Sequence, residues 1–341
     1  MKYNLAIVFC AVILIASSCK KTETTVVPPP VNPKGIFVLC EGNFTGGNAA
    51  ITFYDAVKRE TTDDIFKSAN DFQLGDVGQT ITLIDGKFYV VVNNSGKIEV
   101  VNPADFKVVQ TITGFTSPRS ILKVSDTKAY VSDLYANHLS IVNLSSGTIT
   151  GTISIKSWTE EMVMLNGNVY VGTVENTKIY VVNPATDALT DSIAVGNSPG
   201  NLLLDKNATL WALCGGSEIN ANNGSIYKIS QPGNNVSLFH NFPSPLPYGT
   251  KLSSNSTLDT IYALASDIYR FPFQAASLPA PIIARGQHNW TALGYDSSTG
   301  NIVAGEAFDF NQNGKVYLFN QSLTKVDSFS CGILPSEILF Y

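Results

Sequence analysis

The chain has 341 residues, of which 44% are hydrophobic and only 14% are charged, so it is long enough to bury a large core. The formal net charge of −5 argues against a nucleic-acid surface, which requires clustered Lys and Arg against phosphate. Gly, Thr, Val, Ile, Tyr and Phe are frequent, as is typical of a chain built from β-strands and turns.

The N-terminal segment has the features of an export signal. Residues 1–18 contain a short positive start and an apolar run that is too short to span a bilayer comfortably. The run ends in "IASSC", and the small residues before Cys19 resemble the lipobox of bacterial lipoproteins. That resemblance implies that Cys19 is lipidated, and the Lys20 that follows favours an outer-membrane or cell-surface address. A plain signal peptide with an incidental Cys is the alternative.

Residues 19–34 are polar and rich in Pro, so we expect an extended tether behind the lipidated Cys. The folded part begins at Gly35, and no later segment resembles a linker. Residues 35–341 are therefore predicted to form one domain. Cys40 and Cys214 occupy equivalent places in their repeats, which predicts small buried side chains; one disulfide among these two and Cys331 stays open.

A repeated phrase with an aromatic residue organises this domain. The aromatic residues lie about 41 residues apart in the first four repeats and about 51 apart in the last pair: Tyr89, Tyr130, Tyr170, Trp211 and Tyr262. Each repeat reads as four short strands with Asx and Gly turns between them, the pattern of a β-propeller blade. A β-sandwich also contains many short strands, but the fixed period argues against it.

The two chain ends complement each other. The segment "GIFVLCEGNFTGGNAAITFYDAV" looks like a repeat without its first strand, and "LPSEILFY" looks like a first strand alone. Joined, they make a seventh blade. The predicted fold is therefore all-β: a seven-bladed propeller with four antiparallel strands per blade, closed by N- and C-terminal strands in one blade. We expect the aromatic C-terminus, Phe340 and Tyr341, to be buried in this closure.

"AYVSD" and "VYVGT" stand where YVTN-type repeats of seven-bladed propellers have their signature. The opening "GIFVLCEGNFTGGNAAITFYD" behind a lipoprotein leader is similar to Bacteroidetes surface lipoproteins of the BtuG type. That resemblance implies capture of a corrinoid such as cobalamin for a TonB-dependent transporter, with the protein monomeric or bound to the transporter. It implies no cofactor of the protein's own.

Binding residues are expected on the face where the loops between second and third strands meet the loops that enter each blade. The polar and aromatic residues predicted there are Arg119, Tyr135, Asn137, His138, Trp158, Glu160, Tyr248, His288 and Trp290. Structural roles are the alternatives: Trp158 as a wedge between blades, His138 and His288 as surface residues, and Asn137 as part of a turn. Trp290 is expected to be exposed. Either His would be a good ligand for the metal of a bound corrinoid.

An enzyme is the less favoured interpretation. Positions near the start of each first strand should ring the channel mouth, namely Gln79, Ser120, Glu160, Asn201 and Glu337, with Leu252 and Leu293 interrupting the ring. Propeller lactonases hold a catalytic metal in such a place, but they need more carboxylates and an acid-base partner. We therefore predict no catalytic residue and no metal site. A surface scaffold that binds protein or glycan is the second hypothesis, and a metal-dependent hydrolase is the third.

Overall fold

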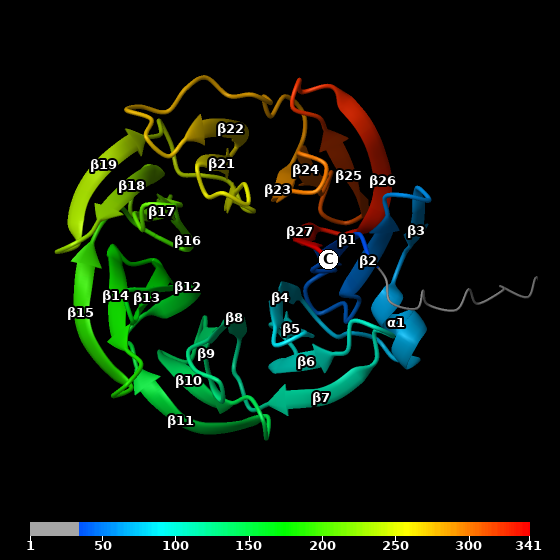
Figure 1. Cartoon of the computed structure of the whole chain (residues 1–341), viewed down its shortest axis with the longest axis horizontal. Helices are drawn as coiled ribbons and strands as arrows, with labels where there is room; N and C mark the ends of the chain where they lie inside the picture. Colours follow the sequence, from blue (N-terminus) through cyan, green and yellow to red (C-terminus); the bar gives the residue numbers. More distant parts are fainter. Residues whose placement is uncertain (1–33) are drawn as a thin grey trace, which may run out of the picture.

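The structure is a computed structural model that describes residues 34–341, which form seven sheets arranged in a ring (Figure 1). The predicted signal peptide, Cys19 and most of the predicted tether lie outside the described residues. Blade 1 contains β27 (Pro335–Phe340), β1 (Ile36–Cys40), β2 (Ala50–Asp55) and β3 (Glu60–Thr62). Blade 2 contains β4 (Gly78–Ile84), β5 (Lys87–Val92), β6 (Lys97–Val101) and β7 (Val108–Thr113). No helix within residues 34–341 is long and apolar enough to cross a membrane.

The next three blades repeat the arrangement of blade 2. Blade 3 contains β8 (Pro118–Lys123), β9 (Lys128–Asp133), β10 (His138–Asn143) and β11 (Thr148–Ser154). Blade 4 contains β12 (Trp158–Leu165), β13 (Asn168–Val174), β14 (Lys178–Asn183) and β15 (Ala188–Ala194). Blade 5 contains β16 (Asn201–Leu204), β17 (Leu210–Cys214), β18 (Ser225–Ser230) and β19 (Asn235–Asn241).

Blade 6 has three strands, β20 (Lys251–Ser254), β21 (Thr260–Ala265) and β22 (Asp267–Pro272), whereas four were predicted for every blade. The chain that follows β22 makes one isolated bridge, between Ile268 and Ile283. Three prolines between residues 272 and 281 explain the missing strand, because proline cannot donate to a ladder. Blade 7 again has four strands, β23 (Trp290–Asp296), β24 (Asn301–Glu306), β25 (Asn313–Phe319) and β26 (Lys325–Ile333).

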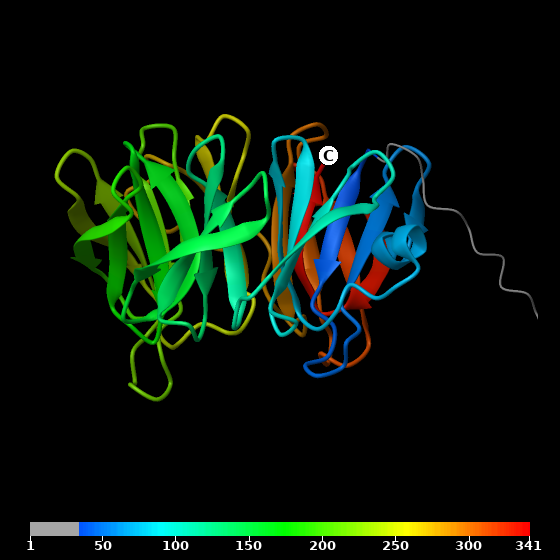
Figure 2. The same cartoon turned by 90° about the horizontal axis from the view of Figure 1, so that it is seen from below.

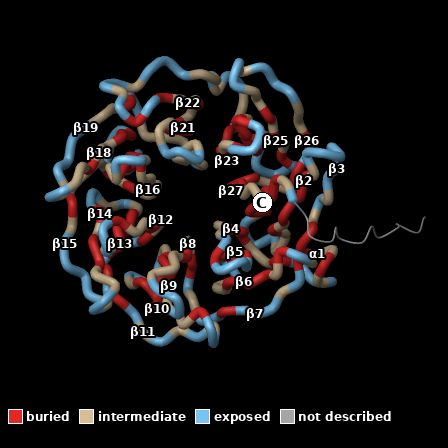
Figure 3. The backbone as a smooth tube through the Cα atoms, viewed as in Figure 1, coloured by how far each residue is buried: buried red, intermediate tan, exposed pale blue. Residues whose placement is uncertain are grey.

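The position of a strand within its blade decides its burial. Second strands such as β5 and β17 are almost completely buried, because neighbouring blades cover both of their faces. Outer strands such as β11 alternate between exposed and half-buried residues at the rim of the ring, as Figure 3 shows. Continuous apolar runs in the sequence therefore mark the middle of a blade. Cys40 and Cys214 end two such second strands and are buried as predicted, and both they and Cys331 are free thiols.

The ring is closed as predicted, by pairing of β1 with β27. Ile36 lies opposite Phe340, and the backbones of Gly35 and Tyr341 exchange hydrogen bonds of 2.7 and 3.0 Å. The Tyr341 ring packs edge-on against Phe88 of blade 2 at 5.0 Å, although Phe340 and Tyr341 are half-buried rather than fully buried. A short helix that was not predicted, α1 (Ile65–Asn70), packs its Ile and Phe side chains into the core between blades 1 and 2.

The two faces of the ring differ, as the side view in Figure 2 shows. One face carries the loops that enter each blade and the loops between second and third strands. Here it is named the mouth face; three long loops on it, 41–49, 215–224 and 307–312, project furthest (Figure 2). The opposite face, named the hairpin face, carries the tight turns after each inner strand. Gly35 and the C-terminus lie on the hairpin face.

Candidate functional site

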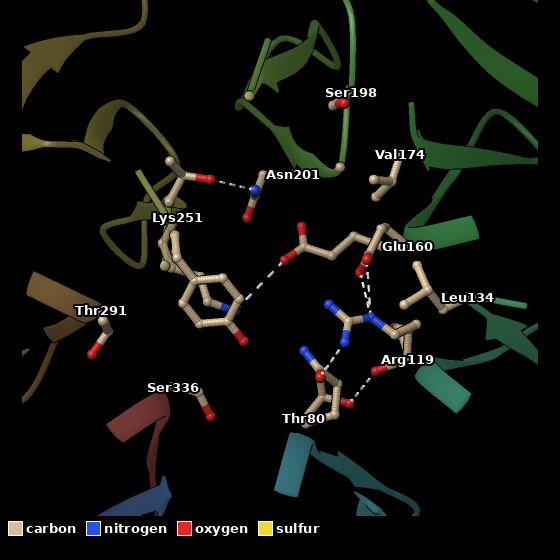
Figure 4. A pocket seen from close by; sticks show the side chains of 18 of the residues that line it. Thr80, Arg119, Leu134, Glu160, Val174, Ser198, Asn201, Lys251, Thr291 and Ser336 are labelled. Carbon is tan, nitrogen blue, oxygen red and sulfur yellow. Dashed lines mark hydrogen bonds and ion pairs between the residues drawn. The ribbon is translucent and has the colours of Figure 1, made fainter. Parts of the chain in front are cut away.

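A cavity of about 380 Å³ opens at the mouth face, at the centre of the ring (Figure 4). It is walled by the first residues of the inner strands and by the loops that lead into them. Its volume lies within the roughly 300–1,000 Å³ typical of small-molecule sites.

β-Bulges turn a set of side chains into this cavity. The ladders between first and second strands skip residues at the mouth end in blades 1, 2, 3, 4 and 7. A bulge leaves its extra residues unpaired and redirects their side chains. All of the skipped residues line the cavity: Gln79, Arg119, Ser120, Glu160, Glu161, Thr291 and Ser336. The irregular start of each blade is thus what gives the channel its polar lining.

Arg119 of blade 3 and Glu160 of blade 4 form an ion pair across the gap between their blades. The Arg119 Nε lies 2.9 Å from both carboxylate oxygens of Glu160, and its Nη1 donates to Gln79 Oε1 of blade 2. Both side chains are about 15% exposed. Burial alone would lower the pKa of Arg119, but the charge and hydrogen bonds of Glu160 outweigh it and raise that pKa. The pair therefore stays ionised.

A second cation faces this pair from blade 6. Lys251 Nζ lies 2.8 Å from Glu337 Oε2 of blade 1 and 4.0 Å from Glu161 Oε1 of blade 4. Burial opposes the charge on Lys251, but the two carboxylates raise its pKa. Figure 4 shows Arg119 and Glu160 on one side of the cavity and Lys251 on the other.

The charge of Glu161 is only weakly compensated, because Lys251 lies 4.0 Å away and is closer to Glu337. Burial raises the pKa of Glu161 to about 7, and neither Lys251 nor the hydrogen bond of 3.0 Å from the Leu202 N–H offsets that effect. The side chain is 32% exposed, but only to the interior of the channel, where protein surrounds it. Glu161 can therefore take up or release a proton near neutral pH.

Glu41, at the end of β1, is a second carboxylate without a cation of its own. The Tyr248 hydroxyl donates a hydrogen bond of 2.5 Å to its Oε1. Burial raises the pKa of Glu41, although Tyr248 and the charges of Arg119 and Lys251 oppose that rise. With every group ionised, three glutamates of the lining face two cations, and Glu337 adds a fourth carboxylate beside Lys251, so the cavity carries an excess of negative charge.

Aromatic rings flank the cavity at its mouth. Trp158 is a wall residue, and Tyr135 packs edge-on against it with 5.4 Å between ring centroids. Tyr248 lines the cavity from the loop before β20, and both tyrosine side chains are more than half exposed. These rings offer apolar area to a ligand while remaining accessible from solvent.

The structure brings some of the predicted site residues together and separates others. Arg119, Trp158, Glu160 and Tyr248 line the cavity, and Tyr135 reaches it through Trp158. The ring predicted at the channel mouth is confirmed for Gln79, Ser120, Glu160 and Asn201, and Leu252 and Leu293 interrupt it as predicted, because they pack into the cores between blades. Glu337 does not line the cavity and joins the site only through its ion pair with Lys251.

The remaining predicted residues lie outside the cavity. Asn137 adopts a positive φ of 54° and accepts a backbone hydrogen bond from Ile155, so it shapes a turn. His138 starts β10 opposite Ser154. The expectation that Trp290 is exposed was wrong: it is 5% exposed, because its ring stacks on His288 and packs into the core between blades 6 and 7.

Sequence reasoning missed three charged members of the site: Glu41, Glu161 and Lys251. Glu161 follows Glu160 directly, and alternation along a regular strand would have pointed it away from the channel. Only the bulge allows both neighbours to reach the cavity. Lys251 directly precedes Leu252, one of the positions near the start of the first strands, and this was the one available signal for it.

The closed ring and the charged cavity at its centre define a seven-bladed β-propeller. The chain belongs to the family described as a domain of unknown function, DUF5074, which matches residues 34–331. No protein with a curated description matches the chain.

Several solved structures share the fold. A quinonprotein alcohol dehydrogenase-like protein from Bacteroides thetaiotaomicron is 19% identical, with a TM-score of 0.74 over 91% of this chain and 79% of that one. Hydrazine synthase from Kuenenia stuttgartiensis is 11% identical, with a TM-score of 0.58 over 76% of this chain and 88% of that one. The computationally designed protein Ika8 is also 11% identical, with a TM-score of 0.60 over 93% of both chains. At such identities the likeness shows the fold alone.

Proposed function

We propose that this propeller binds a small polar molecule in the cavity at its mouth face. The observation that carries the proposal is a cluster of three glutamates and two cations that line an open cavity, with Glu337 paired to one of the cations. Buried ion pairs contribute little to stability and are often replaced by apolar residues at no cost. A fixed set of donors and acceptors beside accessible aromatic rings is instead what orients a ligand.

The position of Gly35, where the folded part begins, supports a role in capture at the cell surface. Gly35 lies on the hairpin face, at the opposite end of β1 from Glu41. A lipid on Cys19 would therefore hold the hairpin face toward the membrane and leave the cavity facing outward. We propose this orientation together with the outer-membrane anchor that the leader sequence predicts.

A corrinoid is the particular ligand that the resemblance to BtuG-type lipoproteins suggests, with delivery to a TonB-dependent transporter. A corrinoid is too bulky to enter a cavity of about 380 Å³ completely. It would lie across the mouth, against Tyr135, Trp158 and Tyr248, with polar substituents directed at the charged cluster. Titration of cyanocobalamin, followed by its visible absorption and by calorimetry, tests this ligand directly.

A surface scaffold is the second candidate, and one observation favours it. Phe44, Ile219 and Phe310 are exposed on the three long loops of the mouth face. Exposed aromatic and aliphatic side chains on projecting loops suit a protein partner. The hydrolase has less support, because Glu160 and Glu337 are each paired with a cation rather than free to hold a metal.

Filling the cavity tests the main proposal. Gly200 lines the cavity, and a Cβ there would lie 3.6 Å from Glu160 Cγ, 3.8 Å from Glu160 Cβ and 4.0 Å from the Ser198 carbonyl oxygen, all ordinary contact distances. Gly200→Phe should therefore fold normally and occupy the cavity. After incubation with a metabolite extract, mass spectrometry should find a small molecule enriched on the wild type and on Lys87→Ala, a hairpin-face control, but not on Gly200→Phe. Equal profiles for all three proteins would contradict binding in the cavity.

A further inference from the structure

A second, smaller pocket adjoins the central cavity. It has a volume of about 120 Å³ and shares two wall residues with the cavity, Pro247 and Tyr248. Its other walls come from blades 6 and 7: Ser266, Arg285, Asn289, Trp290 and Phe310. This side pocket is too small for a whole ligand of ordinary size but has room for a group such as a carboxylate.

The side pocket holds a guanidinium that neutral groups position. Arg285 Nε donates to the His288 carbonyl at 3.1 Å, and Nη2 donates to Asn289 Oδ1 at 2.6 Å. Asn289 is itself fixed, because its Nδ2 donates to the Phe308 carbonyl at 2.6 Å. Within residues 34–341, no carboxylate forms an ion pair with Arg285. Asp267 accepts a hydrogen bond of 2.6 Å from the Arg285 backbone N–H, but the guanidinium itself is oriented without a carboxylate at ion-pair distance.

Trp290 supplies an independent sign of a missing acceptor. This tryptophan is a wall of the side pocket, and its indole Nε1 is buried without a hydrogen-bond partner among the described residues. A buried donor that lacks an acceptor is unfavourable and calls for an explanation. An acceptor group of a ligand, bound beside Arg285, would provide one.

The two pockets have opposite electrical character. The central cavity has an excess of carboxylates, and Glu161 and Glu41 lack a cation of their own. The side pocket contains the Arg285 guanidinium, and the unpartnered indole N–H of Trp290 lies buried in its wall; guanidinium planes pair well with carboxylates. We infer that the ligand is zwitterionic: its carboxylate enters the side pocket against Arg285 and Trp290, and its ammonium group lies in the central cavity near Glu161. This inference rests on the proposed function, because it names the chemical class of that ligand.

Three kinds of probe separate the two ends of such a ligand. The ω-amino acids with three to five methylene groups carry both charges, pentylamine carries only the ammonium group, and pentanoate carries only the carboxylate. In calorimetric titrations, the wild type should bind the best ω-amino acid at least tenfold more tightly than pentylamine or pentanoate. If pentylamine binds as tightly as every ω-amino acid, the inference is overturned.

Arg285→Gln removes the charge that the inference depends on. The variant should bind the ω-amino acids and pentanoate at least tenfold more weakly than the wild type does. Its affinity for pentylamine should be unchanged. Arg270→Gln is the matched control, because Arg270 lies on β22, outside both pockets, and its guanidinium donates a hydrogen bond to the Gln321 carbonyl. It should change none of the affinities. If Arg285→Gln loses as much affinity for pentylamine as for the ω-amino acids, then Arg285 acts only through the fold.

Trp290→Phe keeps a phenyl ring and removes the indole N–H together with the rest of the five-membered ring. Because Trp290 packs in the core between blades 6 and 7, the smaller ring should lower the melting temperature. The inference is tested by selectivity: the affinity for the carboxylate-bearing probes should fall several-fold more than the affinity for pentylamine, and an equal fall for all probes would mean that Trp290 acts only through the fold.

One combination of results would separate the two proposals: pentylamine binds, Gly200→Phe abolishes that binding, and Arg285→Gln changes none of the affinities. Binding in the cavity would then be supported, and the inferred carboxylate of the ligand would be contradicted. If no probe binds the wild type, the zwitterion is excluded, and the metabolite experiment with Gly200→Phe still decides the proposed function.

Discussion

Replacing Glu161 by Gln should stabilise the protein at pH 8 and leave its stability unchanged at pH 4. Burial raises the pKa of Glu161 to about 7, so the native state holds its proton up to that pH. An unfolded chain releases the same proton near the ordinary pKa of 4.5. Between these two values the unfolded state binds fewer protons, and the free energy of unfolding therefore falls as the pH rises. Above pH 7 the full destabilisation caused by the buried carboxylate charge is present. Gln has no charge and therefore does not cause this destabilisation.

The structure sets the size of the effect. A rise from the ordinary value of 4.5 to about 7 corresponds to about 3 kcal/mol, at roughly 1.4 kcal/mol per pKa unit. Water in the channel screens a side chain that is 32% exposed, so we expect about 1–2 kcal/mol. Gln keeps an oxygen that can accept the hydrogen bond from the Leu202 N–H, so that contact should survive.

Urea unfolding of the wild type and of Glu161→Gln at pH 4, 6 and 8 measures the difference. Glu175→Gln is the matched control, because Glu175 lies in a mouth-face loop, outside the cavity lining, and accepts hydrogen bonds from Ser217 and Asn220. The control should show no gain in stability at pH 8. A Glu161→Gln effect that is the same at all three pH values, or a loss of stability at pH 8, would refute the assignment of a raised pKa to this group.

Three further predictions concern the ring, the anchor and the aromatic rim. Deletion of Glu337–Tyr341 should lower the free energy of unfolding by about 5 kcal/mol, because it removes most of the closing strand and four large side chains; an unchanged urea midpoint would show that the closure contributes little. Cys19→Ala should move the protein from the membrane fraction to the soluble fraction, and a variant that still sediments with membranes would reveal another anchor. Trp158→Ala should weaken binding of the cavity ligand by roughly thirtyfold, equivalent to about 2 kcal/mol, whereas Lys87→Ala should bind like the wild type; equal affinities would move the site away from the mouth.

The predictions from sequence succeeded where a local pattern repeats. The aromatic residues of the second strands, such as Tyr89 and Tyr130, recur at the period of one blade and are buried in every case. Closure of the ring could also be predicted, because the incomplete repeat at Gly35 and the unpaired strand at the C-terminus have only each other as partners. The sequence by itself therefore determined the architecture, the number of blades and the face on which a site would lie.

The composition of the site depended on tertiary structure. Glu160 and Glu161 both reach the cavity because a bulge interrupts the alternation of side-chain directions along β12. No local sequence pattern predicts that bulge. Lys251 meets Glu337 across 86 positions of the sequence, and its charge is fixed by neighbours that only the closed ring assembles. Trp290 is buried because His288 and a neighbouring blade cover it. Strand order follows from periods within the chain, whereas the charge of the channel follows from side chains of different blades that meet at one axis.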